Sequence, residues 1–261
     1  MNGRVVALVI GALAAASVSA AAVLMAAGQS EEPKADQDPG PARCADGCPD
    51  LVVDEFTLRR DLKQENMSFG AASCAVREGM APEGDHNYLR FSITTLNIGN
   101  ADLKLGNPQT QPDFFEFQPC HDHYHFQNYA VFRLWDVSAY LEYRDLRDKN
   151  PEATADDILL TNPHLKDGFF AGTKVGFCLR DTSGPRGVMP AGTPRYSDCM
   201  VDQGISVGWG DLYDYTVHGQ WIMIDGATSG AYYLEVEVNP LRILEESDYT
   251  NNALAIRINL A

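Results

Sequence analysis

Three of the six histidines in this 261-residue chain lie at alternate positions, and this spacing restricts the local fold more than any other sequence feature. They are His121, His123 and His125, in the stretch FFEFQPCHDHYHF. In a β-strand, residues two and four apart share one face, whereas in an α-helix His123 would point away from the other two. The spacing therefore predicts an extended segment that gathers three imidazole rings on one side.

These three histidines are candidate metal ligands, because imidazole is the commonest metal-binding side chain. Three imidazoles with an open position suit Cu(II) or Zn(II). Cα atoms four residues apart in an extended strand lie about 13 Å from each other, so the rings reach one ion only if the chain kinks or twists sharply. Asp122 and Tyr124 are expected to face the other way. The alternative is a surface cluster that binds adventitious metal, or a stack of half-buried rings.

The other three histidines show no such pattern. We assign no role to His86 and His164, and keep only His218 as a candidate neighbour of the metal site.

Several further segments alternate apolar and polar residues, which is typical of strands with one face in the core and one in water. Residues 89–94, 233–238 and 253–260 follow this pattern. In residues 233–238 the apolar side chains share one face and two glutamates, Glu235 and Glu237, share the other, which we expect to be solvated.

One stretch, residues 139–160, is helical in character and is interrupted at Pro151. Asn150 precedes the proline and is a candidate cap for a second helix that ends at Leu160. Taken together, the patterns predict a mainly β domain, an antiparallel β-sandwich-like fold with a short helical insertion.

The N-terminus has the composition of a secretory signal. Arg4 is the only charged residue before Glu31, and residues 5–27 are apolar or small. The run is nearly long enough to span a bilayer, so an uncleaved N-terminal anchor is the alternative. We assign residues 1–28 to this segment, 29–43 to a disordered linker rich in Pro, Asp and Glu, and 44–261 to a folded domain. The expected location is secreted or extracytoplasmic, at the cell surface or in the periplasm, where cysteines can form disulfides.

The formal net charge of −16 limits the partners. Nucleic-acid binding requires Lys and Arg to replace phosphate counterions, so we expect no nucleic-acid partner. A cationic substrate would be attracted to such a surface. Contact with a membrane is expected only through an uncleaved N-terminal anchor.

The stretch CHDHYHF at residues 120–126 resembles the copper-binding motif of the lysyl oxidase family, Cys-His-x-His-Tyr-His. Other segments resemble that family in the same order along the chain, so that the resemblance covers about residues 48–260. They are CPDLVVD (48–54), KVGFCLRDT (174–182), GWGDLY (208–213), QWI (220–222), VNP (238–240) and ESDYTNN (246–252). The signal-like run and the small number of cysteines favour a bacterial exported member.

This resemblance implies a copper amine oxidase that makes its own quinone cofactor, lysine tyrosylquinone, from two side chains. By motif position these are Lys174 and Tyr213, with Tyr215 one motif position away from the cofactor tyrosine. The histidine triad would bind copper. Such an enzyme oxidises a primary amine, such as a lysine side chain of an extracellular protein, to an aldehyde and releases ammonia and hydrogen peroxide.

A carboxylate or imidazole near Tyr213 is expected to remove the α-proton of the substrate. Asp211 is the candidate because it lies in the matching motif, and Asp214 and His218 are weaker candidates.

The resemblance also implies a disulfide between Cys120 and Cys199. The other four cysteines, Cys44, Cys48, Cys74 and Cys178, then allow three pairings. The interval between the triad and Lys174 is longer than in animal members, and the helical stretch that accounts for it is expected to cover or gate the site.

Two other functions fit parts of the sequence. The first is a non-catalytic extracellular β-sandwich that binds metal and another protein, since residues 239–252 also resemble adhesion-type modules. Such a module has no use for Lys174 together with Tyr213. The second is a zinc hydrolase that activates a metal-bound water with three histidines. It would need a carboxylate acting on that water, and the sequence contains no His-Glu-x-x-His pattern.

Overall fold

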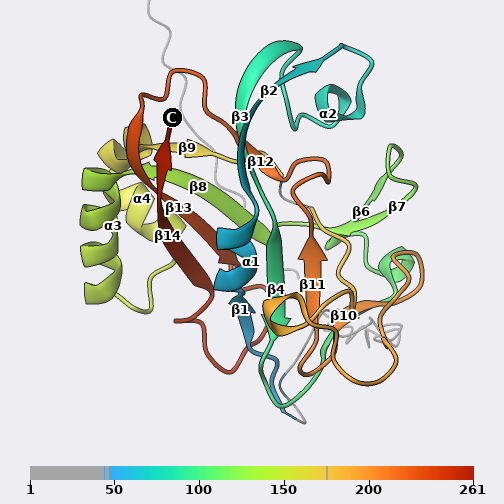
Figure 1. The fold of residues 1–261 in the computed structure, drawn as a ribbon. Helices are drawn as coiled ribbons and strands as arrows, with labels where there is room; N and C mark the ends of the chain where they lie inside the picture. The colour runs from blue at the N-terminus through green and yellow to red at the C-terminus, as the bar shows by residue number, and fades with distance from the viewer. Residues whose placement is uncertain (1–43, 45–46, 175) are drawn as a thin grey trace, which may run out of the picture. The chain divides into compact units, whose positions relative to one another are not determined.

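The computed structural model describes Cys44, residues 47–174 and residues 176–261. The predicted signal or anchor (1–28) and linker (29–43) lie outside the described residues. Within the described part, strands outnumber helices and pair antiparallel throughout (Figure 1). This confirms the predicted mainly β fold with a short helical insertion.

The largest sheet has four strands in the order β14-β13-β8-β9. Its members are β8 (Ala130–Asp136), β9 (Phe169–Ala171), β13 (Gly230–Val238) and β14 (Ala253–Leu260). Residues 253–260 behave as the alternation predicted: Ile256, Ile258 and Leu260 are buried, while Arg257 and Asn259 are exposed.

The other described strands form smaller sheets in the orders β1-β4-β11, β12-β3-β2, β10-β5 and β6-β7. The predicted strand at residues 89–94 is divided at Ser92 between β3 and β4. The bounds are β1 (Leu51–Val53), β2 (Leu62–Phe69), β3 (Gly84–Phe91), β4 (Ile93–Asn97), β5 (Leu103–Gly106), β6 (Phe115–Gln118), β7 (His123–Phe126), β10 (Gln203–Ile205), β11 (Gly210–Tyr213) and β12 (Trp221–Met223).

The polar face of β13 is not solvated, and this part of the prediction is wrong. Glu235 and Glu237 are each 2 % exposed. Arg133 on the paired strand β8 lies 3.2 Å from Glu235 and 2.9 Å from Glu237, and Arg147 of the helical insertion lies 2.8 Å from Glu237. Alternation shows which residues share a face, but not what covers that face.

The helical insertion consists of α3 (Val137–Lys149) and α4 (Ala155–Thr161). Asn150 does not cap the second helix. It ends α3, with its side chain donating to the Leu146 carbonyl, while Thr154 caps α4 through a reciprocal hydrogen-bond pair with Asp157. Pro151 therefore lies in the connection between the helices.

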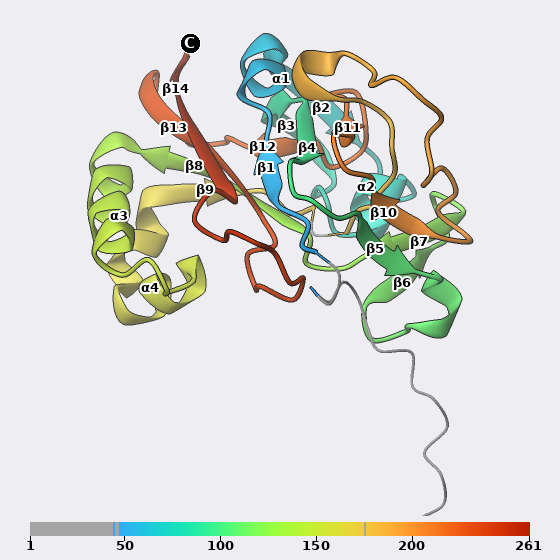
Figure 2. The same cartoon turned by 90° about the horizontal axis from the view of Figure 1, so that it is seen from below.

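The insertion packs on β8 and β13 through stacked aromatic rings. Trp135 and Tyr143 have ring centroids 4.7 Å apart, and Tyr140 and Tyr233 4.2 Å apart. In Figures 1 and 2 the two helices lie at one end of the folded domain and the β6–β7 hairpin, which carries the histidines, at the other. The expectation that the insertion covers or gates the site is therefore wrong.

The remaining described helices are short. They are α1 (Glu55–Arg60), α2 (Cys74–Arg77) and the 3-10 segments Pro108–Thr110, Pro163–Gly168 and Pro185–Gly187. Among the described residues, no helix has the length and apolar character needed to cross a bilayer.

The structure contains three disulfides, and it contradicts the pairing that the resemblance implied. Cys120 is bonded to Cys74 and Cys199 to Cys178, so the predicted Cys120–Cys199 bridge is wrong. The reason is geometric, since α2 packs beside the turn that carries Cys120 and places Cys74 within bonding reach of it. Disulfides of this kind are typical of extracellular proteins.

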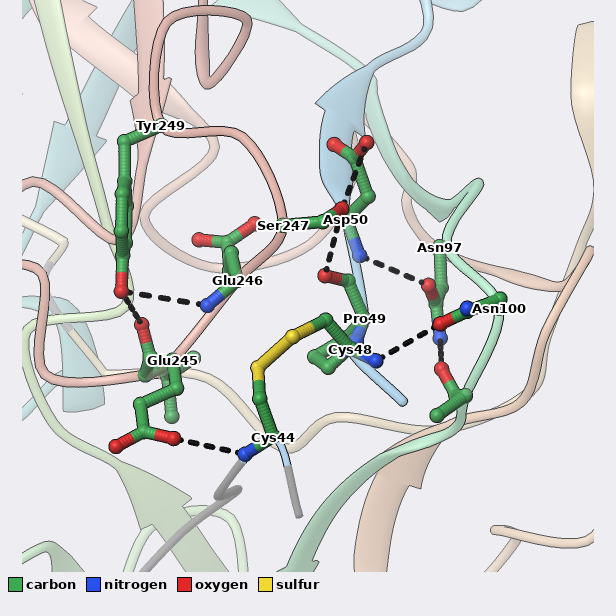
Figure 3. Close-up of a disulfide and its surroundings, with 12 residues drawn as sticks. Cys44, Cys48, Pro49, Asp50, Asn97, Asn100, Glu245, Glu246, Ser247 and Tyr249 are labelled. Atoms are coloured by element: carbon green, nitrogen blue, oxygen red, sulfur yellow. Dashed lines mark hydrogen bonds between the residues drawn. A yellow bond between two sulfur atoms is a disulfide. The ribbon is translucent and has the colours of Figure 1, made fainter. Parts of the chain in front are cut away.

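The third disulfide, Cys44–Cys48, closes a short loop at the start of the described domain (Figure 3). The Cys44 backbone N–H donates to Glu245, and the Cys48 N–H donates to Asn100. The first contact joins the beginning of the domain to the loop that precedes β14, and the second joins it to the loop between β4 and β5.

Candidate active site

The three predicted histidines meet at one end of the β6–β7 hairpin. His123 and His125 lie in β7 and therefore share a face. His121 lies in the turn before β7, where Asp122 adopts a left-handed backbone conformation with φ of 55°. This turn is the sharp kink that three ligands on one ion require.

The spacing of the ring nitrogens fits a metal site. One nitrogen from each histidine lies within 4.8 Å of the others, and the Nε2 atoms of His123 and His125 are 3.1 Å apart. Metal–nitrogen bonds of about 2.0–2.1 Å hold neighbouring ligand nitrogens roughly 3 Å apart. The hairpin therefore holds the triad close to the geometry that an imidazole-preferring ion such as Cu(II) or Zn(II) needs.

The environment of His123 and His125 favours the neutral imidazole, which is the form that binds metal. Burial lowers the pKa of His125 to about 2, and the nearby Lys174 contributes to the shift. Burial also lowers the pKa of His123. A proton therefore competes less with a metal at these two rings than at an ordinary histidine.

Two further side chains lie beside the triad. His218, the histidine kept as a candidate neighbour, has its ring centroid 5.8 Å from that of His121. Glu78 places Oε2 3.0 Å from His121 Nε2. Glu78 follows α2, and the Cys74–Cys120 disulfide joins that helix to the residue before His121.

Lys174 and Tyr213 also come together, as the resemblance implied. Lys174 is 3 % exposed, and its Nζ lies 5.4 Å from the centre of the Tyr213 ring. The Tyr213 hydroxyl is fixed by the backbone of Cys178: the Cys178 N–H donates to it at 2.6 Å, and it donates to the Cys178 carbonyl at 2.7 Å. Burial lowers the pKa of Lys174 to about 8 and raises that of Tyr213.

Backbone pairing connects the Lys–Tyr pair to the triad. Phe177 exchanges two backbone hydrogen bonds with Phe126, the last residue of β7, and its ring lies 4.9 Å from that of Tyr213. Gly176 allows close approach to the triad, because a Cβ there would lie 3.0 Å from the Cβ of His125.

Asp211 lies two residues before Tyr213 in β11, so the two side chains share a face of the strand. It is 3 % exposed, and burial raises its pKa to about 7. Its Oδ1 accepts a hydrogen bond from Thr182, while Oδ2 is buried with no hydrogen-bond partner in the described structure. A carboxyl group with this pKa can exchange protons near neutral pH.

The other candidates are engaged elsewhere. Asp214 accepts hydrogen bonds from the backbone and side chain of Thr216 within a turn. Tyr215 bonds Lys63, and His86 and His164 pair with Asp225 and Glu142.

Glu78 was missed from the sequence, because no local pattern marks it. Only the pairing of Cys74 with Cys120 would have placed it beside the triad. A pocket of about 420 Å³ opens here, and its walls include Glu78, Glu116, His125, Lys174 and Gly176.

The fold and the site define an antiparallel β domain with a three-histidine candidate metal centre next to a pair formed by the buried Lys174 and the partly buried Tyr213. A sequence model described as Lysyl oxidase matches residues 52–144 and 157–261. The chain therefore belongs to the lysyl oxidase family.

Similar proteins carry corresponding names. The chain is 29 % identical over 224 residues to Lysyl oxidase homolog 4 of Homo sapiens and 31 % over 222 residues to Lysyl oxidase homolog 3A of Danio rerio; the matches cover 82 % and 81 % of this chain and 25 % of each relative. It is 30 % identical over 218 residues to Protein-lysine 6-oxidase of Homo sapiens, covering 80 % of this chain and 45 % of that protein.

The chain thus spans about a quarter of the length of the first two relatives and less than half of the third. These relatives are animal proteins, so the expected bacterial origin stays a prediction.

Proposed function

We propose that this protein is a copper-dependent amine oxidase that converts primary amines, such as the lysine side chains of extracellular proteins, to aldehydes with release of ammonia and hydrogen peroxide. The observation that carries the proposal is the position of Lys174 Nζ, 5.4 Å from the Tyr213 ring in a segment paired with the histidine strand. A metal-binding module without catalysis has no need of this Lys–Tyr pair. We propose a secreted or extracytoplasmic location, which agrees with the three disulfides.

The residues present fit both components of the cofactor system. His121, His123 and His125 would hold copper, and Lys174 and Tyr213 would supply lysine tyrosylquinone. When present, this quinone acts as an electron sink for amine oxidation, with oxygen as the final electron acceptor.

The side chains of this protein have separate tasks in such a reaction. Lys174 supplies a neutral amine to the Tyr213 ring more readily than an ordinary lysine does, because burial lowers its pKa to about 8. The Cys178 backbone fixes the Tyr213 hydroxyl and hence the position of the ring edge that Lys174 must reach. We propose Asp211 as the base that takes a proton from the substrate carbon.

Peptide mass mapping of protein expressed with copper tests the proposal. We expect a covalent peptide that joins Lys174 to Tyr213 and reacts with a hydrazine. Lys174→Ala and Tyr213→Phe should each abolish peroxide release and leave metal uptake intact.

The chain offers a matched control pair, Lys63 and Tyr215, whose Nζ and hydroxyl oxygen lie 2.7 Å apart outside the triad. Lys63→Ala and Tyr215→Phe should retain turnover. Normal turnover in either the Lys174 or the Tyr213 variant would overturn the quinone assignment and leave a metal-binding module as the better description.

A further inference from the structure

We propose that Glu78 binds the ammonium group of the incoming amine and so selects lysine-like alkylammonium substrates. This inference rests on the amine oxidase function proposed above. It assigns a substrate-binding role to a residue outside the histidine triad and the Lys–Tyr pair.

The two carboxylate oxygens of Glu78 have different surroundings. Oε2 contacts His121 Nε2 at 3.0 Å, whereas Oε1 is buried and has no hydrogen-bond partner among the described residues. Buried polar atoms are nearly always satisfied, because an unpaired one loses its hydration without compensation. Because Glu78 lines a pocket, a donor that arrives with a ligand can pair with this oxygen once the side chain turns toward it.

The pocket brings the Glu78 side chain close to the reacting groups. Glu78, His125 and Lys174 line the same 420 Å³ space. Glu116 lies directly opposite His125 in the β6–β7 pairing, so its side chain is on the same face, where it adds a second carboxylate. Arg77 opposes these charges, but like Glu116 it is exposed to water, where charges are screened, so the less exposed Glu78 carries the argument.

Lys174 indicates which ligand this environment accepts. Its side chain is a primary amine on a flexible alkyl stem in the pocket wall, where burial lowers its pKa and the charge of Glu78 partly opposes that shift by favouring the protonated form. Once the Lys174 nitrogen is bonded to the Tyr213 ring, that cation is lost and Glu78 is left without it. A substrate with the same chemistry, a lysine side chain or an alkyl diamine, then replaces the missing charge.

Substitution of Glu78 by Gln tests the inference, because the amide removes the charge and can still hydrogen-bond His121. We expect KM for a lysine-containing peptide to rise about 10- to 100-fold, in the range for loss of a charged hydrogen bond, with kcat changed much less. Metal content, melting temperature, the Lys174–Tyr213 peptide and the rate of reaction with a neutral hydrazine should match those of the unsubstituted protein.

Glu152→Gln is the matched control. The Glu152 side chain is 99 % exposed, and this substitution removes the same charge at a position outside the pocket. It should leave KM unchanged. An unchanged KM in Glu78→Gln, or a loss of bound metal in that variant, would overturn the inference, the second by showing that Glu78 positions His121. Absence of the cross-linked peptide and of peroxide release in the unsubstituted protein would instead overturn the proposed function itself.

Discussion

At the scale of single residues, burial adjusts Lys174 and Tyr213 in opposite directions. Lys174 loses hydration as a cation, so its pKa falls to about 8, while Tyr213 is held as a neutral phenol because burial raises its pKa. A nitrogen must be unprotonated to form a bond with a ring carbon. The pair is thus poised for cross-linking near neutral pH.

The rate of cross-link formation after copper is added to metal-free protein should therefore rise with pH through about 8, as Lys174 loses its proton. An ordinary lysine, with a pKa of about 10.4, would place this rise more than two units higher. The yield of the Lys174–Tyr213 peptide at a fixed early time measures the rate of cross-link formation at each pH. A rate that does not change across about one unit on either side of this pKa would contradict the prediction.

Asp211 gives a second pH dependence at this scale. A base must be deprotonated, and burial raises the pKa of Asp211 to about 7, so kcat/KM should rise as pH increases through about 7. Asp211→Asn should remove this rise and lower the rate about 10²- to 10⁴-fold. Its melting temperature above pH 7 should not fall, because the substitution removes a buried charge.

Asp214→Asn is the control for this prediction, since Asp214 accepts hydrogen bonds within its own turn. It should keep both the rate and the pH profile. If Asp211→Asn retains the rise near pH 7, another group acts as the base.

At the scale of elements, two glycines allow the segment around Lys174 to pack closely against neighbouring segments of the chain. Gly219 has a φ of +78°, and a Cβ there would lie 2.9 Å from the Cβ of Lys174 and 2.7 Å from the sulfur of Met80. A Cβ on Gly176 would instead meet His125. Gly219 therefore leaves room for Lys174, and Gly176 leaves room for His125.

Alanine at these two positions should separate the two parts of the site. Gly219→Ala is expected to reduce the yield of the Lys174–Tyr213 peptide while metal binding persists, whereas Gly176→Ala is expected to weaken metal binding directly. Gly226→Ala controls for backbone strain, because its φ of +83° is similar and no atom lies within 4 Å of the added Cβ. Equal defects in the Gly219 and Gly226 variants would show that strain, not displacement of Lys174, causes the effect.

The positions of the strands could be predicted from the sequence better than the residues that pack against them. Period-two alternation identified β13 and β14 and the shared face of His123 and His125, because alternation follows directly from strand geometry. It did not reveal that Glu235 and Glu237 are covered, since the covering Arg133 and Arg147 come from other elements. Glu78 was missed for a similar reason, because it follows α2 and reaches the triad only through the Cys74–Cys120 disulfide.

At the scale of the whole molecule, two disulfides connect distant segments to the candidate site. Cys74–Cys120 joins α2, and with it Glu78, to the turn of His121, and Cys178–Cys199 holds the backbone that fixes the Tyr213 hydroxyl. Cys44–Cys48 spans only four positions at the edge of the domain. The three bridges should therefore differ in their effects on stability and on the site.

Paired replacement of Cys74 and Cys120 by serine should lower the free energy of unfolding by about 4 kcal/mol on the chain-entropy estimate, against about 2 kcal/mol for the Cys44–Cys48 pair, because the longer bridge constrains more of the unfolded chain. Only the first replacement should also weaken metal binding, since it frees the turn of His121 from α2. Denaturant unfolding and metal titration of the two double variants measure both effects. Equal metal affinity in the two would mean that the β6–β7 hairpin holds the triad without help from α2, and the role of this bridge would then be confined to stability.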